Sequence, residues 1–196
     1  MIKSDSSKFG KPLYILYPGD YFATKDECIL GTVTSSCVVV CLYDPGRLIG
    51  GMGHFIVPGA IGTSGIVSDE IARLGISSME FIIGEIVKLG GDRKFLRAKI
   101  FGAGYSEEHK KSTDEMTTSN IRFIHEYFLL ENIPVERNDL GGDFRRRIYF
   151  STRDGVVYRQ VLKNNEESSG FIKLEQEYID VQFRNKKKTG RILIFE

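Results

Sequence analysis

The sequence lacks any long apolar run, which excludes several classes of protein. Residues 1–10 contain no apolar core long enough for a signal peptide. No later stretch approaches the ~20 apolar residues that a transmembrane helix needs. We therefore expect a cytoplasmic protein that does not insert into a membrane.

The sequence also lacks an excess of charge of either sign. Its 27 Lys and Arg residues nearly balance its 26 Asp and Glu residues, and the basic residues gather only in short runs. Nucleic acid is therefore not expected as a partner. The run Arg145-Arg146-Arg147 is interpreted as a solvated face rather than a phosphate site.

Cysteine and histidine are scarce. The cysteines are Cys28, Cys37 and Cys41, and the histidines are His54, His109 and His125. An odd number of cysteines in a chain without an export signal favours free thiols over disulfides. They are also too few and too unevenly spaced for a structural zinc site.

The chain is long enough, at 196 residues with 41% apolar and 11% aromatic residues, to build a core. The pattern predicts an α/β fold, a layered β-rich sheet core with two principal helices, and shows no internal repeat. Strands are expected at 13–17, 28–34, 38–43, 48–52, 54–58, 95–102, 146–150 and 156–162, and helices at 77–89 and 120–130. The first helix is expected to start with a capping box at residues 77–80.

We divide the chain into a disordered N-terminal tail (1–12), a main domain (13–163) and a C-terminal extension (164–196). The extension is expected to form a β-hairpin, with strands at 178–183 and 191–195, that packs on the domain. The segment 104–116 is expected to be a charged surface loop.

Cys37 is the candidate nucleophile. Small hydroxyl residues precede it and an apolar β-branched run follows it, which predicts a position at the mouth of a buried strand. The turn at 44–46 lies midway between positions 37 and 54, so antiparallel pairing would bring His54 back beside Cys37. An imidazole is the usual device for holding a thiol as thiolate. Taken alone, these residues fit an inert core cysteine and a structural histidine better than catalysis.

Several blocks of sequence together resemble the chemoreceptor glutamine deamidase family, CheD. They are Tyr17-Pro18-Gly19-Asp20, Ser35-Ser36-Cys37-Val38-Val39-Val40-Cys41, Gly50-Gly51-Met52-Gly53-His54-Phe55, Phe101-Gly102-Ala103-Gly104 and Asp139-Leu140-Gly141-Gly142. They occur in the family's order and cover roughly residues 13–162. Gly102-Ala103-Gly104 by itself is weak evidence for a cofactor, and 139–142 is interpreted as a turn near the site.

The resemblance implies a protein-glutamine glutaminase that hydrolyses particular glutamine side chains of methyl-accepting chemotaxis receptors, with Cys37 as nucleophile and His54 as base. It implies no metal or cofactor. The family's third residue, a threonine, maps best to Thr32, which would orient the imidazole, and Thr34 is a competing assignment. A CheC-type phosphatase is the other partner that the resemblance implies.

The chain departs from the family beside the nucleophile, where Ser35 replaces the usual glycine and carries a Cβ that opposes a positive φ. This departure keeps open a second interpretation, a weakly active or inactive module that binds a receptor or a CheC-type phosphatase. A third interpretation is a thiol hydrolase or acyltransferase that acts on small amides.

Overall fold

The computed structural model describes residues 2–4, 9–57, 61–62, 64–104, 112–162 and 166–186. The elements in these ranges are, in chain order, β1 (Ile2–Ser4), β2 (Leu13–Ile15), β3 (Tyr21–Thr24), β4 (Ile29–Thr34), β5 (Val38–Asp44), β6 (Ile49–Phe55), the short 3-10 helix η1 (Ile66–Ser68), α1 (Ala72–Lys88), the 3-10 helix η2 (Arg93–Phe95), β7 (Arg97–Gly102), α2 (Ser112–Leu130), β8 (Val135–Leu140), β9 (Arg145–Ser151), β10 (Val157–Leu162) and α3 (Glu166–Lys186).

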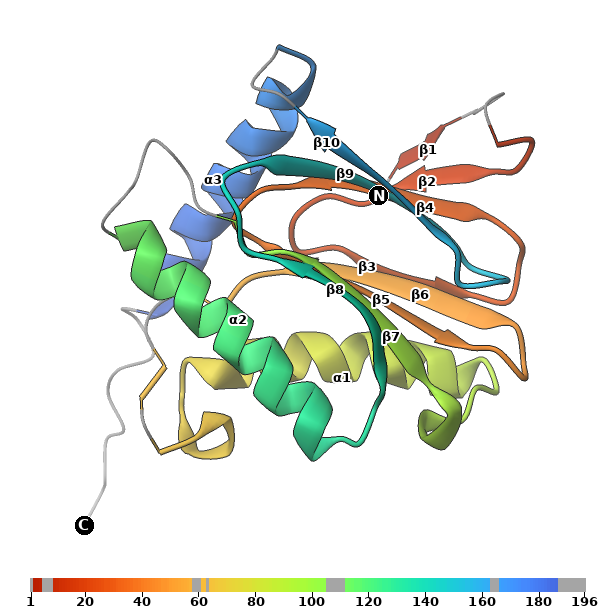
Figure 1. Ribbon diagram of the computed structural model, residues 1–196, viewed down its shortest axis with the longest axis horizontal. Coiled ribbons are helices and arrows are strands. Elements are labelled where there is room, and N and C mark those ends of the chain that lie inside the picture. The colour runs from red at the N-terminus through yellow and green to blue at the C-terminus, as the bar shows by residue number, and fades with distance from the viewer. Residues whose placement is uncertain are drawn as a thin grey trace.

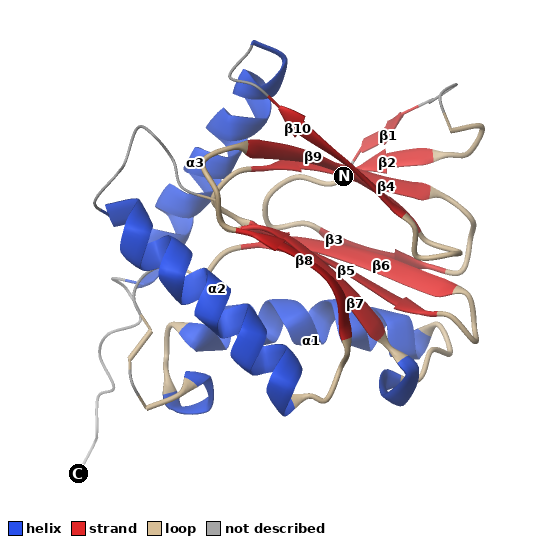
Figure 2. Ribbon diagram, in the orientation of Figure 1, coloured by secondary structure: helices blue, strands red, loops and turns tan. Residues whose placement is uncertain are grey.

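Two five-stranded mixed sheets stack on each other (Figure 1). One has the order β1-β2-β4-β9-β10 and the other β3-β6-β5-β7-β8. Helices α1 and α2 cover the outer face of the second sheet, and α3 lies at one end of the stack (Figure 2). The predicted layered α/β fold with two principal helices is confirmed, and α3 is a third helix that was not expected.

Strand β5 is buried on both faces, because it lies between the helices and the other sheet. Val38, Val40 and Leu42 belong to the core that includes residues of α1 and α2. Val39 and Cys41 alternate with them and belong to the core between the sheets. A strand covered on both sides needs apolar residues at every position, which explains the unbroken apolar run.

The tight turn after β5 sets the register that the site depends on. The Asp44 side chain accepts hydrogen bonds from the main-chain N–H groups of Gly46 and Arg47, at 3.0 and 3.1 Å. The returning strand β6 then places His54 opposite Val39, two residues from Cys37. The predicted return of the histidine beside the cysteine is confirmed, although one strand, β6, replaces the two that were expected at 48–52 and 54–58. Residue 58 lies outside the described ranges.

Both principal helices begin earlier than the sequence pattern predicts. The capping box at 77–80 is wrong, because α1 begins at Ala72 and the Asp69 side chain accepts from the N–H groups of Ile71 and Ala72. The loop expected at 104–116 is helical from Ser112, where α2 begins. Its residues 105–111 lie outside the described ranges.

The expected strand at 178–183 is wrong, since these residues form part of α3. Apolar and polar residues alternate there over a short stretch, which satisfies a strand period as well as a helix period. The buried and half-buried residues of α3 instead follow helical spacing: 171, 172, 175, 176, 178, 179 and 182. The second expected strand, 191–195, lies outside the described ranges.

The predicted disorder of the N-terminal tail is wrong at residues 2–4, because β1 pairs with β2. The solvated face predicted for 145–147 is wrong for Arg146, whose side chain is buried and donates to the carbonyl of Gly141 and to Asp139, at 2.5 and 3.2 Å. Strand alternation in β9 turns this middle arginine inward. Gly141 and Gly142 both have positive φ and form the predicted turn.

Candidate active site

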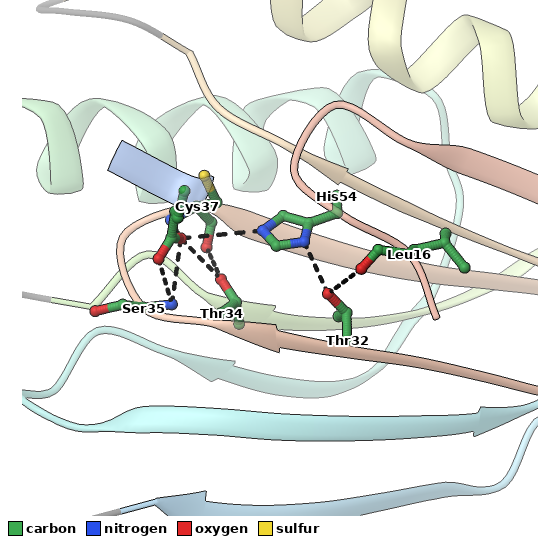
Figure 3. Close-up of polar contacts among 7 residues, drawn as sticks. Leu16, Thr32, Thr34, Ser35, Cys37 and His54 are labelled. Carbon is green, nitrogen blue, oxygen red and sulfur yellow. Dashed lines mark hydrogen bonds and ion pairs between the residues drawn. The ribbon is translucent and has the colours of Figure 1, made fainter. Parts of the chain in front are cut away.

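Thr32, Cys37 and His54 come together although they belong to different parts of the sheet stack (Figure 3). Thr32 lies in β4 of one sheet, His54 in β6 of the other, and Cys37 in the connection that crosses between the sheets. All three are buried. Sγ of Cys37, a ring nitrogen of His54 and a carboxylate oxygen of Glu175 lie within 4.8 Å of one another.

Thr32 sets the orientation of the imidazole. Its hydroxyl donates to the main-chain carbonyl of Leu16 at 2.8 Å and contacts Nδ1 of His54 at 2.9 Å (Figure 3). Because a hydroxyl has one proton, the contact with His54 requires Nδ1–H to be the donor. Nε2 of the neutral ring is then a lone-pair base.

The competing assignment, Thr34, does not contact the imidazole in this way. Its hydroxyl donates to the carbonyl of Cys37 at 2.8 Å (Figure 3). The geometry therefore favours Thr32 as the residue that orients His54. Thr34 instead holds residues 35–37, the connection between β4 and β5, which we call the nucleophile loop.

Nε2 of His54 has no hydrogen-bond partner among the described residues, although the side chain is almost fully buried. The nitrogen lies 3.9 Å from Oε1 of Glu175, beyond hydrogen-bond range. A buried, unpaired nitrogen is unfavourable for stability alone. A ring nitrogen of His54 lies within 4.8 Å of Sγ of Cys37, and the unpaired Nε2 is suited to accept the thiol proton.

Main-chain hydrogen bonds from residues 103 and 104, just after β7, hold the nucleophile loop in place. Ala103 N–H donates to the carbonyl of Cys37 at 2.8 Å, and Gly104 N–H donates to the carbonyl of Ser35 at 2.7 Å. Gly102 has a φ of 98°, and a Cβ there would lie 2.1 Å from the carbonyl oxygen of Cys37. The segment 102–104, a weak cofactor signal in the sequence, thus fixes the loop.

The carbonyls of Ser35 and Cys37 are bound by the segment after β7, and the N–H groups of the same two residues donate to α3. Cys37 N–H donates to Oε1 of Glu175 at 2.6 Å, and Ser35 N–H donates to both carboxylate oxygens, at 3.2 and 3.1 Å. Paired N–H groups next to a nucleophile form the usual binding site for a developing oxyanion. Here they hold a carboxylate of the same chain.

The main-chain N–H of Ser35 donates in this way despite the departure from the family pattern. Among the described non-glycine residues, only Leu48, Ala103 and Asn132 have positive φ. Ser35 therefore does not need the left-handed conformation that would favour glycine. The backbone strain expected from its Cβ is absent.

Burial and the neighbouring Glu175 carboxylate both favour the neutral thiol of Cys37. Burial raises the pKa of Cys37 well above its ordinary value, and the nearby Glu175 carboxylate raises it further. Burial alone would also raise the pKa of Glu175, but the imidazole of His54, in its protonated form, and the Cys37 N–H together lower it below its ordinary value. The carboxylate is thus ionised and the nucleophile protonated.

Sequence reasoning missed Glu175, because α3 is rich in acidic residues and the surroundings of this one are set by tertiary packing. The other two cysteines are buried thiols away from the site, and burial raises the pKa of each. His125 is exposed, and His109 lies outside the described ranges.

Cys37, His54 and Glu175 are the one group in the described part of the chain whose side chains could hold a metal ion. Their chemistry would suit Zn²⁺. The carboxylate charge is, however, already matched by the N–H groups of Ser35 and Cys37, so the arrangement is accounted for by hydrogen bonding.

Comparison with known proteins identifies the family. Residues 58–161 match the family described as CheD chemotactic sensory transduction. A Shewanella oneidensis protein, "Probable chemoreceptor glutamine deamidase CheD 1", is 36% identical over 92% of this chain and 86% of its own. The chain belongs to the CheD family.

Two further CheD proteins support this assignment. "Probable chemoreceptor glutamine deamidase CheD 2" of Chromobacterium violaceum is 37% identical over 92% of this chain and 88% of its own. The CheD of Laribacter hongkongensis, named in the same way, is 34% identical over 82% of each chain. The CheD family match begins after His54, so the site residues Thr32, Cys37 and His54 lie outside it.

Among solved structures, a hypothetical protein of Bacillus licheniformis, YfiH, matches 62% of this chain and 51% of its own at 21% identity, with a TM-score of 0.38. This likeness is too slight to support a conclusion. No helix in the described ranges combines the length and apolar character needed to cross a bilayer.

Proposed function

We propose that this protein hydrolyses the side-chain amide of glutamines on methyl-accepting chemotaxis receptors. The printed names of its CheD relatives support the reaction and the substrate. The observation that carries the proposal is the buried pair of Cys37 and His54, with Nε2 unpaired and the main-chain N–H groups of Ser35 and Cys37 beside the thiol.

The first half of the reaction uses these groups in order. Nε2 of His54 takes the thiol proton, and Sγ of Cys37 attacks the carboxamide carbon. The N–H groups of Ser35 and Cys37 stabilise the oxyanion that forms. The C–N bond then breaks, the proton held on His54 passes to the nitrogen, and ammonia leaves a thioester on Cys37.

The second half restores the enzyme. His54 takes a proton from water, the hydroxide attacks the thioester carbon, and the C–S bond breaks. Glutamate is released and the thiolate takes the proton back from His54. The carboxylic acid that forms gives its proton to the released ammonia, so the net reaction converts glutamine and water to glutamate and ammonium. Thr32 keeps Nε2 directed at the reaction by holding Nδ1–H in both halves.

We also propose a cytoplasmic location and a CheC-type phosphatase as a second partner. A helix of either partner laid beside Cys37 would use a helix-in-groove mode, in which one side chain enters the site. The non-catalytic interpretation, a CheD-like binding module, differs in one outcome: it would bind receptor or phosphatase without releasing ammonia.

Intact mass spectrometry of a receptor cytoplasmic fragment tests the function. We expect a gain of about 1 Da for each converted glutamine with the unmodified protein and none with Cys37→Ala. Cys41→Ala is the matched control, because this second buried thiol lies between the sheets and should not affect turnover. No mass gain with several receptor fragments and a folded protein would reject the enzyme and favour the binding module.

A further inference from the structure

Helix α3 covers the candidate site. Cys37 is 0% exposed and His54 is 1% exposed. Ile179 of α3 packs in one cluster with Cys37, Ile56 and Met116. A glutamine on another protein cannot reach the thiol while α3 stays in this position.

Glu175 is an unusual residue for the packed face of such a helix. It is 2% exposed, and burying a carboxylate is unfavourable unless charge and hydrogen bonds compensate. Its compensation comes from the N–H groups of Ser35 and Cys37, which the proposed reaction uses for the oxyanion. The carboxylate is also the chemical group that deamidation of glutamine produces.

We propose that α3 is a built-in product analogue, in which Glu175 occupies the position of the newly formed glutamate and α3 must leave before a substrate helix binds. This inference rests on the proposed deamidase function. It accounts for the neutral thiol of Cys37, since the docked helix buries this residue and the carboxylate of Glu175 beside it further disfavours a thiolate.

The contacts of α3 also describe the substrate that the site accepts. Phe171, four residues before Glu175, stacks on Tyr17 with ring centroids 5.6 Å apart. Ile179, four residues after, enters the Cys37 cluster. The site therefore selects a glutamine in the middle of a helix, flanked on the same face by an aromatic residue at −4 and an aliphatic residue at +4.

A glycine in the loop after β2 allows α3 to pack closely against the backbone there. Gly19 has a φ of 90°, and a Cβ there would lie 2.9 Å from the Tyr178 ring of α3. Tyr178 thus rests directly on the backbone of the loop between β2 and β3. This contact, three residues after Glu175, adds a third point of recognition on one helix face.

The variant Glu175→Gln tests the proposal, because it turns the product analogue into a substrate. Cys37 should attack the carboxamide of residue 175, release ammonia and, after water opens the thioester, regenerate the original glutamate. We expect purified E175Q to gain about 1 Da at residue 175, and the double variant E175Q with C37A to keep its glutamine.

Two positions on the same helix provide matched controls, the natural glutamine at 176 and a glutamine introduced at 177. Gln176 is adjacent in sequence, and its amide donates to Asp180 instead of entering the site. Glu177→Gln places a second test glutamine on the exposed side of α3. Both should remain unconverted when residue 175 is converted, because neither reaches Cys37.

The receptor fragment assay, run with the same E175Q sample, separates the two proposals. Conversion at residue 175 that requires Cys37 supports both. A glutamine that stays unconverted at position 175, in a sample that deamidates the receptor, would overturn the product-analogue proposal and leave the deamidase function intact. A third outcome is that E175Q converts neither its own residue 175 nor the receptor fragment, and that the unmodified protein is also inactive on the receptor fragment. This outcome would reject both the deamidase function and the product-analogue proposal.

A second variant, Glu175→Ala, tests the covering role without any self-reaction. Removing the carboxylate deprives α3 of its charge-assisted hydrogen bonds, so we expect the initial rate on the receptor fragment to rise at least about tenfold. Glu177→Ala is the control and should leave the rate unchanged. An E175A rate equal to or below that of the unmodified protein would contradict release of α3 as a condition for activity.

Discussion

The reactivity of Cys37 should report directly whether α3 is docked. Glu175→Ala removes the acceptor of the N–H groups of Ser35 and Cys37. Hydrogen bonds to charged groups contribute about 1.5–3 kcal/mol each, and the burial of the carboxylate offsets part of this. A net loss of ~2 kcal/mol corresponds to a change of about 30-fold in the fraction of molecules with α3 undocked.

The direction of the pH dependence follows from the two shifted groups. Docking raises the pKa of Cys37, so this contribution to docking is present below about pH 8.5, the ordinary thiol value, and is lost as pH rises above it. Docking lowers the pKa of Glu175, so its contribution is present above about pH 4.3 and is lost as pH falls below that value. The docked position of α3 should therefore be most stable between about pH 4.3 and about pH 8.5.

Alkylation with iodoacetamide, followed by peptide mass spectrometry from about pH 6 to about pH 10, measures this effect. At about pH 7.5 we expect Cys37 to react about 30-fold faster in Glu175→Ala than in the unmodified protein, with the difference shrinking above about pH 8.5. Cys41 is an internal reference, since it is fully buried between the sheets and should react slowly in both. If Cys37 is alkylated at the same rate in Glu175→Ala and in the unmodified protein across this range, Glu175 is not the group that holds α3.

Three further substitutions test the site and its support. Thr32→Val should lower kcat about 10- to 100-fold with little change in KM, because His54 loses the acceptor that holds Nδ1–H; an unchanged kcat in the receptor assay would remove Thr32 from the site. Ser35→Gly should change the initial rate by less than about threefold, since the donor is a main-chain N–H and Ser35 does not have a positive φ. A larger gain in rate would indicate that the Ser35 side chain strains the backbone. Arg146→Met should lower the free energy of unfolding by about 3 kcal/mol in urea denaturation, because it leaves the buried carbonyl of Gly141 unpaired and removes the ion pair with Asp139. A loss below about 0.5 kcal/mol would contradict this role.

Local patterns predicted that Cys37 and His54 come together, because the two residues flank one hairpin, whereas their proposed roles came from the family resemblance. The apolar run after Cys37 and the turn at 44–46 fix the β5–β6 register, and register alone brings His54 back to the thiol. Helix starts were predicted less well, because the cap of α1 comes from Asp69, an acidic residue within a glycine- and serine-rich stretch. Such a cap is visible only once the chain path is known.

The C-terminal extension could not be predicted, for a physical reason. Its buried face combines aromatic and aliphatic residues with one carboxylate, so no apolar stripe of ordinary width marks it as a packed helix. The partners that make Glu175 tolerable in the interior, the N–H groups of Ser35 and Cys37, are 140 and 138 residues away in sequence. Only the folded structure brings this charge and these donors together.

The same two N–H groups create a constraint on turnover. A donor pair that stabilises the oxyanion also stabilises the carboxylate product, because both place negative charge on oxygen at the same point. The proposed reaction therefore forms a product that its own site holds well, and α3 supplies the same anion in the same chain. A helix that redocks as product leaves would displace the modified receptor by competing for these donors. Added receptor fragment that already carries glutamate should accordingly inhibit Glu175→Ala more strongly than the unmodified protein, in which α3 already occupies the site.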